Sequence, residues 1–308
     1  EQEIDRERSV VQQEIRRSRD VPAAWCGELL GQALFGDQPL GWSTTGTEDT
    51  VAELQRQDFL TWLDTWYGLG NIVLSVAGRT SHDKVVALAR RLFGNGRTGE
   101  APAVVPVNGH LPARRVSSDS RPISQANMAL GLPALRRNDP DRYVLQLLTS
   151  VLGRGMSSRL FKEVRERRGL AYSVSSSVSR HKDTGVFAVT AGVSPEKLTE
   201  AATVILEELA KVTQEAVPKD ELTKARDYTV GNFRLSLETP MALAQRAGEQ
   251  LLTLGEIEPI ETVVERLESV SAEDILRVAQ RVLVQENAAL AVVGPDLDDE
   301  RLLALLAA

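Results

Sequence analysis

Two pairs of polar residues, each seven positions apart, are the strongest candidates for chemistry in this chain of 308 residues. Glu7 and Glu14 lie in a charged segment whose apolar positions, among them Val11 and Ile15, predict a one-faced helix over residues 2–19. Seven residues are close to two helical turns, so both carboxylates lie on one side, beside the apolar stripe. A carboxylate in that position is costly unless a cation meets it. The spacing therefore fits a cation-binding pair, and it fits two solvated surface glutamates equally well.

The second pair is Arg165 and Tyr172. Gly169 lies between them, so we expect the arginine to end a helix and the tyrosine to enter a strand. A guanidinium and a phenol that project toward one place could hold a carbonyl or a carboxylate by hydrogen bonds. A surface arginine and an unrelated sheet tyrosine would have the same spacing, so both interpretations stay open.

Other reactive residue types are scattered along the sequence. His82, His110 and His181 have no partner at i+4, and we expect them to be solvent-facing loop residues. The glycine loop at Gly153–Gly155 could bind an anion at the following helix, or could be a flexible connection. It lacks the rest of a dinucleotide-binding fingerprint, and no G-x-S-x-G elbow occurs. The residues alone do not assemble a complete active site.

Composition excludes several classes of protein. A net charge of −7 argues against nucleic acid or an anionic membrane as the main partner. The single cysteine, Cys26, rules out an internal disulfide framework and a cysteine-rich zinc module. No apolar run approaches the ~18–20 residues needed to span a bilayer. A reduced compartment, and two domains because of the length, are the expectation.

Two stretches of the sequence repeat one another at a constant offset of 216 positions. Asp58 and Asp274 each open a helical pattern that leads to Asn71 or Asn287 and then to a strand pattern N-x-x-L-x-V-x-G. So many matched positions predict a duplicated domain. Two unrelated helix–strand units are the simpler alternative. If the second copy starts near residue 116, the same offset places the start of the first copy about a hundred residues before Glu1. We therefore expect a C-terminal piece of a longer chain.

Periodicity and turn signals predict mostly helices with a few strands. The fold class expected is α+β: two homologous α/β sandwich domains, each a mostly antiparallel sheet with helices packed on one face, the first domain incomplete. The boundaries expected are 1–100 for the C-terminal half of the first domain, 101–115 for a linker and 116–308 for the second domain. Helices are predicted over 2–19, 23–35, 47–67, 81–93, 139–152, 158–167, 195–213, 218–235, 240–254 and 271–284, and strands over 72–77, 128–132, 171–179, 185–192 and 288–293.

Four stretches of sequence resemble the pitrilysin/insulinase family of zinc peptidases, the inverzincins, which includes the mitochondrial processing peptidase and its bacterial relatives. They are ERSVVQQEIRRSRDVP, FGDQPLGWSTTGTEDTV, YGLGNIVLSVAG and, most specifically, DRYVLQLLTSVLGRGMSSRLFKEVRERRGLAYSV followed by DTGVFAVTAGVS. The resemblance implies homologous α/β domains of roughly two hundred residues, in agreement with the repeat.

The resemblance also implies roles for both pairs. In this family an H-x-x-E-H helix supplies two zinc-binding histidines and a general base. ERSVVQQE matches the segment with the third ligand, so Glu14 would bind Zn²⁺ and Glu7 would be a supporting catalytic carboxylate. Arg165 and Tyr172 match an R-x-x-x-x-x-x-Y pattern that binds the peptide substrate, and the tyrosine could also stabilise the oxyanion.

H-x-x-E-H occurs nowhere in these 308 residues, and we expect it upstream of Glu1. The main hypothesis is thus a piece of a zinc-dependent metalloendopeptidase of peptides or unfolded polypeptides, inactive by itself because one carboxylate cannot replace three zinc ligands. A non-catalytic partner or core subunit of the same family is the alternative, and a processing factor for a small modified peptide is a third. A homodimer or paired family subunit and a cytoplasmic location are expected.

Overall fold

The computed structural model describes residues 1–100, 102–109, 112 and 115–307, and these fall into two compact units that we treat separately. Unit 1 contains Glu1–Glu14, Thr45–Pro106 and Asn232–Pro259. Unit 2 contains Ile15–Thr44, Val107–Gly231 and Ile260–Ala308. Each unit combines three separate stretches of the sequence. The expected limits 1–100, 101–115 and 116–308 divide the chain differently, into the two copies of the repeat and the linker between them. Those limits remain a prediction.

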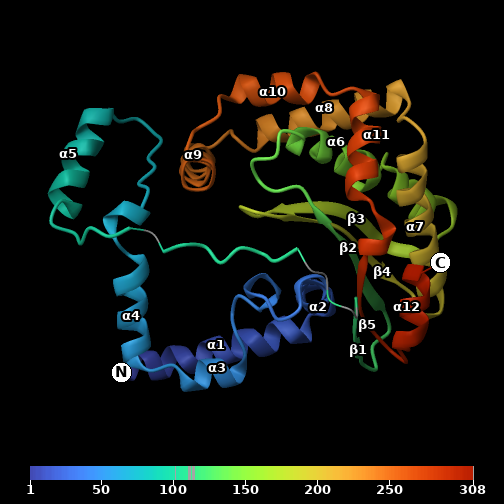
Figure 1. Cartoon of the computed structure of the whole chain (residues 1–308), viewed down its shortest axis with the longest axis horizontal. Helices are drawn as coiled ribbons and strands as arrows, with labels where there is room; N and C mark the ends of the chain where they lie inside the picture. Colours follow the sequence, from blue (N-terminus) through green and yellow to red (C-terminus); the bar gives the residue numbers. More distant parts are fainter. Residues whose placement is uncertain (101, 110–111, 113–114, 308) are drawn as a thin grey trace. The chain divides into compact units, whose positions relative to one another are not determined.

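Unit 2 is built on one five-stranded mixed sheet (Figure 1). Its strands are β1 (Val116–Ser120), β2 (Ala126–Ala134), β3 (Ala171–Arg180), β4 (Gly185–Val193) and β5 (Ala289–Gly294), in the spatial order β1-β5-β2-β4-β3. Only the β1–β5 pair is parallel, so the sheet is mostly antiparallel as expected. The predicted β3–β4 hairpin is present, and the His181 amide donates to the carbonyl of Thr184 in its turn.

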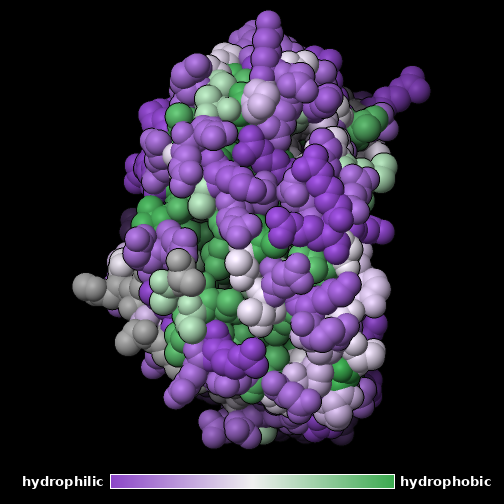
Figure 2. All heavy atoms as spheres, turned by 90° about the vertical axis from the view of Figure 1, so that its right-hand side faces the viewer, coloured by the Kyte–Doolittle hydropathy of each residue, from purple (hydrophilic) through white to green (hydrophobic). Residues whose placement is uncertain are grey.

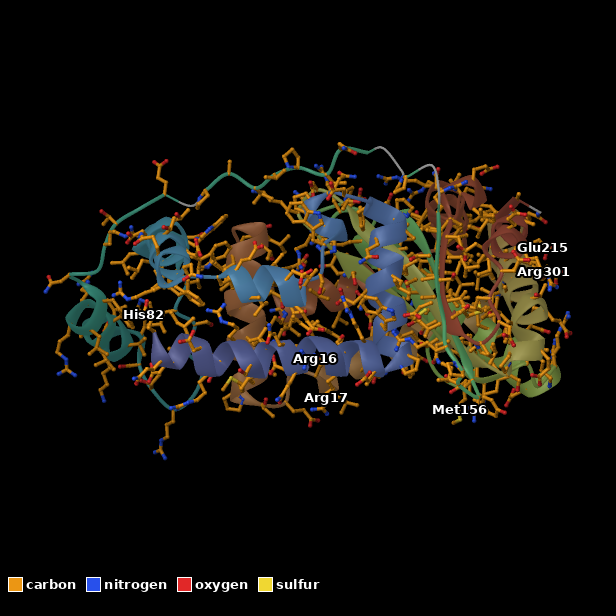
Figure 3. All side chains as sticks on the ribbon, turned by 90° about the horizontal axis from the view of Figure 1, so that it is seen from below. Arg16, Arg17, His82, Met156, Glu215 and Arg301 are labelled. Carbon is orange, nitrogen blue, oxygen red and sulfur yellow. The ribbon has the colours of Figure 1, made fainter. Side chains whose placement is uncertain are left out.

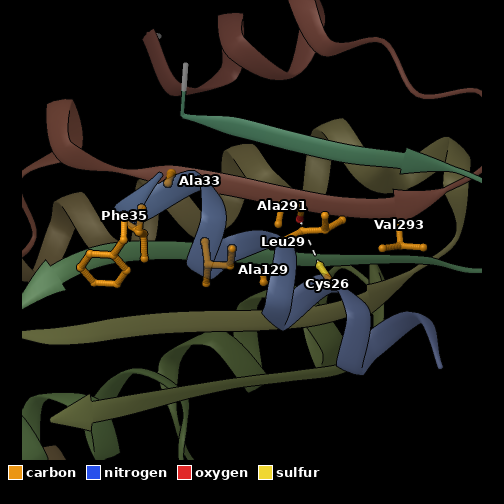
Figure 4. Packing of buried hydrophobic residues seen from close by; sticks show 10 residues of the cluster. Cys26, Leu29, Ala33, Phe35, Ala129, Ala291 and Val293 are labelled. Atoms are coloured by element: carbon orange, nitrogen blue, oxygen red, sulfur yellow. Dashed lines mark hydrogen bonds between the residues drawn. The ribbon is translucent and has the colours of Figure 1, made fainter. Parts of the chain in front are cut away.

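Helices cover both faces of this sheet, which corrects the expectation of a single helical layer. α2 (Pro22–Phe35) packs on β5 and β2, where Cys26, Leu29 and Phe35 form a core with Ala291 of β5 (Figure 4). Every residue of β5 is buried. Because successive side chains of a strand point to opposite faces, a strand buried at every position needs cover on both sides.

The helices that cover the other face of the sheet are among the remaining helical elements of unit 2 (Figure 1). Figure 2 shows that hydrophilic side chains cover most of the face on the right-hand side of Figure 1. The elements are η1 (Pro39–Gly41), α6 (Arg142–Gly153), η3, a π-helix (Phe161–Arg167), η4 (Pro195–Lys197), α7 (Leu198–Gln214), α8 (Lys219–Leu235, whose last residues belong to unit 1), α10 (Ile260–Glu268), α11 (Ala272–Val282), η5 (Gln285–Asn287) and α12 (Asp299–Ala307). The sequence patterns did not predict β1, α10 or α12.

Unit 1 is helical in the part of the chain that the structure describes. It holds most of α1 (Gln2–Asp20), with α3 (Glu48–Glu53), α4 (Arg56–Trp66), η2 (Leu69–Asn71), α5 (His82–Phe93) and α9 (Pro240–Leu254). The single helix predicted over 47–67 is wrong. Leu54 leaves the helical region with φ −56° and ψ 129°, and a new helix starts where Asp58 accepts from the Gln55 amide.

The strand predicted over 72–77 has no strand beside it. Ile72 has extended backbone angles, φ −120° and ψ 132°, but no described residue pairs with 73–77 in a ladder. A strand needs a neighbour to satisfy its amides and carbonyls, so this segment stays extended and unpaired. Within the described residues, no helix is both long and apolar enough to cross a membrane.

Candidate functional site

α1 carries Glu7 and Glu14 on one side, as the heptad spacing predicts. Arg8 fixes this helix to α3, since its guanidinium donates to the carbonyls of Val51 at 2.6 Å, Ala52 at 2.9 Å and Leu54 at 2.9 Å. These are carbonyls at the C-terminal end of α3, which lack partners inside their own helix. The anchor therefore orients α1 and leaves the two carboxylates exposed.

The residues present do not fit a complete zinc site. Catalytic zinc commonly takes three protein ligands. Among residues 1–100, 102–109, 112 and 115–307, no three His, Cys, Asp or Glu side chains form a group that could hold a metal ion. Neither Glu7 nor Glu14 is hydrogen-bonded or ion-paired to another described residue. Their roles as supporting carboxylate and ligand stay predictions.

Arg165 projects from an irregular helix in unit 2. The segment predicted as a helix over 158–167 forms a π-helix at Phe161–Arg167. Such helices are rare and occur frequently at functional sites. The Arg165 guanidinium carbon lies 5.0 Å from the centre of the Phe161 ring, while the side chain remains exposed. The ring supports the cation and leaves its N–H groups available to a ligand.

Tyr172 lies at a β-bulge. Ala171 pairs with Val193 and Ser173 pairs with Gly192, so Tyr172 is the additional residue on β3. A bulge redirects a side chain away from the regular alternation of its strand. Accordingly Tyr172 is 66% exposed, and its hydroxyl lies 3.4 Å from the hydroxyl of Ser194. The sequence predicted the strand but carried no signal of the bulge, which depends on the register with β4.

A short turn connects the elements that carry Arg165 and Tyr172. The Leu170 amide donates to the carbonyl of Val164 at 2.8 Å, and Gly169 provides the left-handed conformation (φ 59°) that the turn requires. Arg165 and Tyr172 are one and two residues from this hydrogen bond. Both residues therefore flank the same turn of unit 2.

Two further residues support this turn, and sequence reasoning missed them. The Lys197 ammonium donates to the carbonyl of Gly169 at 3.0 Å, and the Ser194 hydroxyl lies at the Tyr172 phenol. Both belong to the segment that follows β4, so only the folded hairpin brings them to the turn. They restrain the backbone on which Tyr172 is mounted.

The glycine loop after α6 borders a cavity of about 230 Å³. Its lining carries charges of both signs, from Arg154, Lys162, Lys224, Asp220 and Glu221. Met156, in the loop, is 76% exposed and points away from the fold (Figure 3). Because charges of both signs line the cavity, the lining does not favour an anion-binding glycine loop over a flexible connection.

The histidines and the cysteine do not gather into a site within the described residues. His82 is exposed on the first turn of α5 (Figure 3), and His110 lies outside the described residues. His181 is half-buried in the hairpin turn, where burial and the nearby Arg137 cation lower its pKa. The Cys26 thiol is buried and donates to the Ala291 carbonyl at 3.2 Å, and burial raises its pKa to about 12.

Comparison with known proteins identifies the family. Residues 53–228 match the family described as "Peptidase M16 inactive domain". This chain belongs to the M16 peptidase family. It is 35% identical over 306 residues to an uncharacterized zinc protease of Streptomyces coelicolor, across 97% of this chain and 66% of that protein. The chain thus spans about two thirds of that relative's length.

Solved structures agree in fold. An M16 inactive-domain peptidase structure from Pseudomonas fluorescens matches 96% of this chain and 71% of its own, with a TM-score of 0.88 and 19% identity. A chain of complex III2 from Candida albicans matches 97% and 74%, with a TM-score of 0.85 and 16% identity. Together with the sequence match, these confirm the expected pitrilysin-type family and its mixed α/β fold.

Proposed function

We propose that this chain forms the substrate-binding part of a zinc-dependent metalloendopeptidase that hydrolyses peptides or unfolded polypeptides. Family membership and the relative's name support a zinc peptidase. The observation that carries the substrate-binding role is the turn at Gly169, which joins two irregular elements that expose Arg165 and Tyr172. A regular α-helix and a regular strand are the usual structures. Here Arg165 lies on a π-helix and Tyr172 at a β-bulge, and these are the two residues expected to bind substrate.

The chemistry of the pair suits a peptide backbone. Arg165 offers guanidinium N–H donors, and the Tyr172 hydroxyl can donate to a carbonyl oxygen. An oxyanion that forms from that carbonyl accepts such a bond more strongly than the neutral group does. In this proposal Arg165 orients the substrate, and Tyr172 both binds it and stabilises the negative charge that develops.

The metal-binding part of the proposal concerns Glu14 and Glu7. Glu14 contributes one carboxylate to Zn²⁺, Glu7 supports it, and the other ligands come from residues that are not among these 308. This accords with the repeat, in which residues 1–100 are half of a first domain, 101–115 a linker and 116–308 a second domain. When bound, Zn²⁺ would act as a Lewis acid that polarises the peptide carbonyl and makes water a stronger nucleophile.

A peptide-binding experiment tests the substrate role with the 308-residue chain itself. Fluorescence anisotropy with a labelled, unstructured peptide of ~15 residues measures the affinity of the wild type, Arg165→Ala and Tyr172→Phe. A charged hydrogen bond contributes ~1.5–3 kcal/mol, so Arg165→Ala should weaken binding roughly 10- to 100-fold. Tyr172→Phe should weaken it roughly 2- to 10-fold. Arg168→Ala, also exposed and at the end of the same helix, is the matched control. Equal affinities for all variants would reject the role.

Zinc content tests the metal proposal separately. The chain alone should bind no stoichiometric zinc and show no peptidase activity. Protein produced from the longer reading frame should bind zinc and cleave the peptide, and Glu14→Ala in that protein should remove both properties. One tightly bound zinc in the 308-residue chain, measured by mass spectrometry, would refute the proposed incompleteness.

A non-catalytic partner or core subunit is the second candidate. It is favoured by the similarity in fold to a chain of complex III2 and by the description of the matched region as an inactive domain. In this case the longer protein would bind no zinc but would associate with a paired family subunit. Together with the metalloendopeptidase function, we propose a homodimer and a cytoplasmic location.

A further inference from the structure

The charged groups around the cavity beside the glycine loop are not equally available to a ligand. The Glu221 carboxylate accepts two hydrogen bonds from the Arg159 guanidinium, one on each oxygen and both at 2.9 Å. This is the bidentate geometry of a strong ion pair. The Lys224 ammonium lies 3.5 Å from the Asp220 carboxylate, one turn away along α8. Both carboxylates that line the cavity therefore already have a cationic partner.

Two cations of the lining have no such partner. Arg154 follows α6 and Lys162 lies at the start of η3, and the side chain of neither forms an ion pair or a hydrogen bond with a described residue. Glu163, the neighbour of Lys162, is ion-paired with Arg167. Lys162 is half-buried, and removing a cation from water is costly unless an anion meets it. With the two ion pairs counted as neutral, the lining keeps two uncompensated positive charges.

Contacts between the surrounding elements hold the cavity in shape. The hydroxyl of Ser150, in the lining, lies 2.7 Å from the hydroxyl of Thr229 and joins α6 to α8. The bidentate ion pair joins the residues just before η3 to α8 as well. Gly155 has φ 81°, and a Cβ added there would lie 3.4 Å from the Tyr228 ring, so the glycine loop lies against α8. A ligand does not have to order these elements, which lowers the cost of binding.

Size and charge define the kind of ligand. Pockets for drug-sized molecules have volumes of ~300–1,000 Å³, whereas this cavity has about 230 Å³. Ser157 adds a hydroxyl and an amide to the lining, and neither donates to any residue that the structure describes. Two cations with these donors match a small dianion better than a monoanion. Because the whole chain has a net charge of −7, attraction of an anion must come from this local group.

We infer that this cavity is a binding site for a phosphate dianion, held by Arg154, Lys162 and Ser157. The ligand is either inorganic phosphate or a small phosphate monoester, whose organic part would contact Val151 and the Tyr228 ring in the lining. The site uses none of the residues proposed to bind peptide or zinc. The inference is therefore independent of the proposed peptidase function.

Isothermal titration calorimetry of the 308-residue chain with inorganic phosphate, at pH 8 and low ionic strength, tests the site. Saturable 1:1 binding is expected. Lys162→Gln and Arg154→Gln should each weaken it roughly 10- to 100-fold, because each removes a charged hydrogen bond. Lys182→Gln is the matched control, since it removes an exposed lysine of the β3–β4 turn that is not in the lining, and it should leave the affinity unchanged. Absence of saturable binding, or equal weakening by all three substitutions, would overturn the inference.

A substitution that strengthens binding provides a second, independent test. Asp220→Asn removes a negative charge from the lining and releases Lys224 from its ion pair. Exposed ion pairs of this kind are weak, so the variant should bind phosphate about 1.5- to 5-fold more tightly than the wild type. Unchanged or weaker binding by Asp220→Asn would also overturn the inference.

Two other anions test the class of ligand. Acetate, a monoanion, should bind at least ~10-fold more weakly than phosphate, because it cannot engage both cations equally well. Equal affinities for acetate and phosphate would reject a dianion site. Phenyl phosphate distinguishes the two sources of the phosphate group. Tighter binding of phenyl phosphate than of inorganic phosphate supports a monoester, and equal or weaker binding supports free phosphate.

Discussion

Gly131 of β2 lies directly under α2, and this contact supports a quantitative prediction. A Cβ added at Gly131 would lie 2.9 Å from both methyl carbons of Leu30 and 3.0 Å from a methyl carbon of Leu34. Optimal carbon–carbon contacts are ~3.5–4.0 Å. Gly131→Ala should therefore overpack the interface at a cost of ~1–3 kcal/mol, reduced by ~0.4–1 kcal/mol because alanine restricts the unfolded chain.

Leu30→Ala in turn should destabilise by ~2–5 kcal/mol, since Leu30 is 5% exposed and its removal leaves a cavity. The double variant should be less destabilised than the sum by at least ~1 kcal/mol, because the added methyl group enters the vacated space. Gly27→Ala is the matched control, since its added Cβ would meet nothing within 4 Å. It should stabilise α2 by ~0.5–1 kcal/mol.

Urea unfolding followed by tryptophan fluorescence measures these free energies. Trp62 and Trp66 of unit 1 are first replaced by Phe, so that the signal comes from Trp25 and Trp42 of unit 2. Additive effects of Gly131→Ala and Leu30→Ala, within ~0.3–0.5 kcal/mol, would refute the packing of α2 on β2. The same result would remove the argument that the sheet is covered on both faces.

Two further predictions concern single groups in unit 2. Burial raises the pKa of Cys26 to about 12, so a thiol-reactive disulfide reagent at pH 8 should modify this thiol only after unfolding. Rapid stoichiometric labelling of the native protein would contradict the burial of Cys26. The pKa of Asp119 is lowered mainly by its hydrogen bond from Arg121, at 2.6 Å, and also by that from Trp25. The folded state therefore favours the charged carboxylate, so its stabilising effect is present above the unfolded pKa of ~3.9 and is lost as pH falls through the lower folded value. Urea midpoints between pH 2 and 6 should fall less steeply with pH for Asp119→Asn than for the wild type, and parallel curves would contradict this linkage.

Local pattern was sufficient for most elements because periodicity reports which side of a segment is apolar. The stripe with Val11 and Ile15 located α1, and the apolar run at Met128–Leu132 located β2. Pattern could not show the break at Leu54, where capping by Asp58 competes with continuation of the helix. It also could not show that α2 packs on a sheet formed by residues beyond 115, since a helix pattern does not specify its partner.

The candidate site was predictable in its residue types but not in its geometry. The spacing of Arg165 and Tyr172, with the glycine between them, indicated a helix–turn–strand. The bulge at Tyr172 depends on its pairing with β4, and the contact of Lys197 with Gly169 depends on how the hairpin folds back. Both are tertiary effects that no local signal encodes.

The two halves of the proposed function should be experimentally separable, because Arg165 and Tyr172 lie in unit 2 and Glu14 lies in unit 1. Arg165 lies on the π-helix and Tyr172 on β3 of unit 2, whose core is closed, so the 308-residue chain should bind peptide. In the proposal Glu14 is one of several zinc ligands, so the same chain should bind peptide without binding zinc. Peptide binding that is lost on Arg165→Ala in zinc-free protein would show that the two roles are independent. Peptide binding that requires added zinc would contradict this separation.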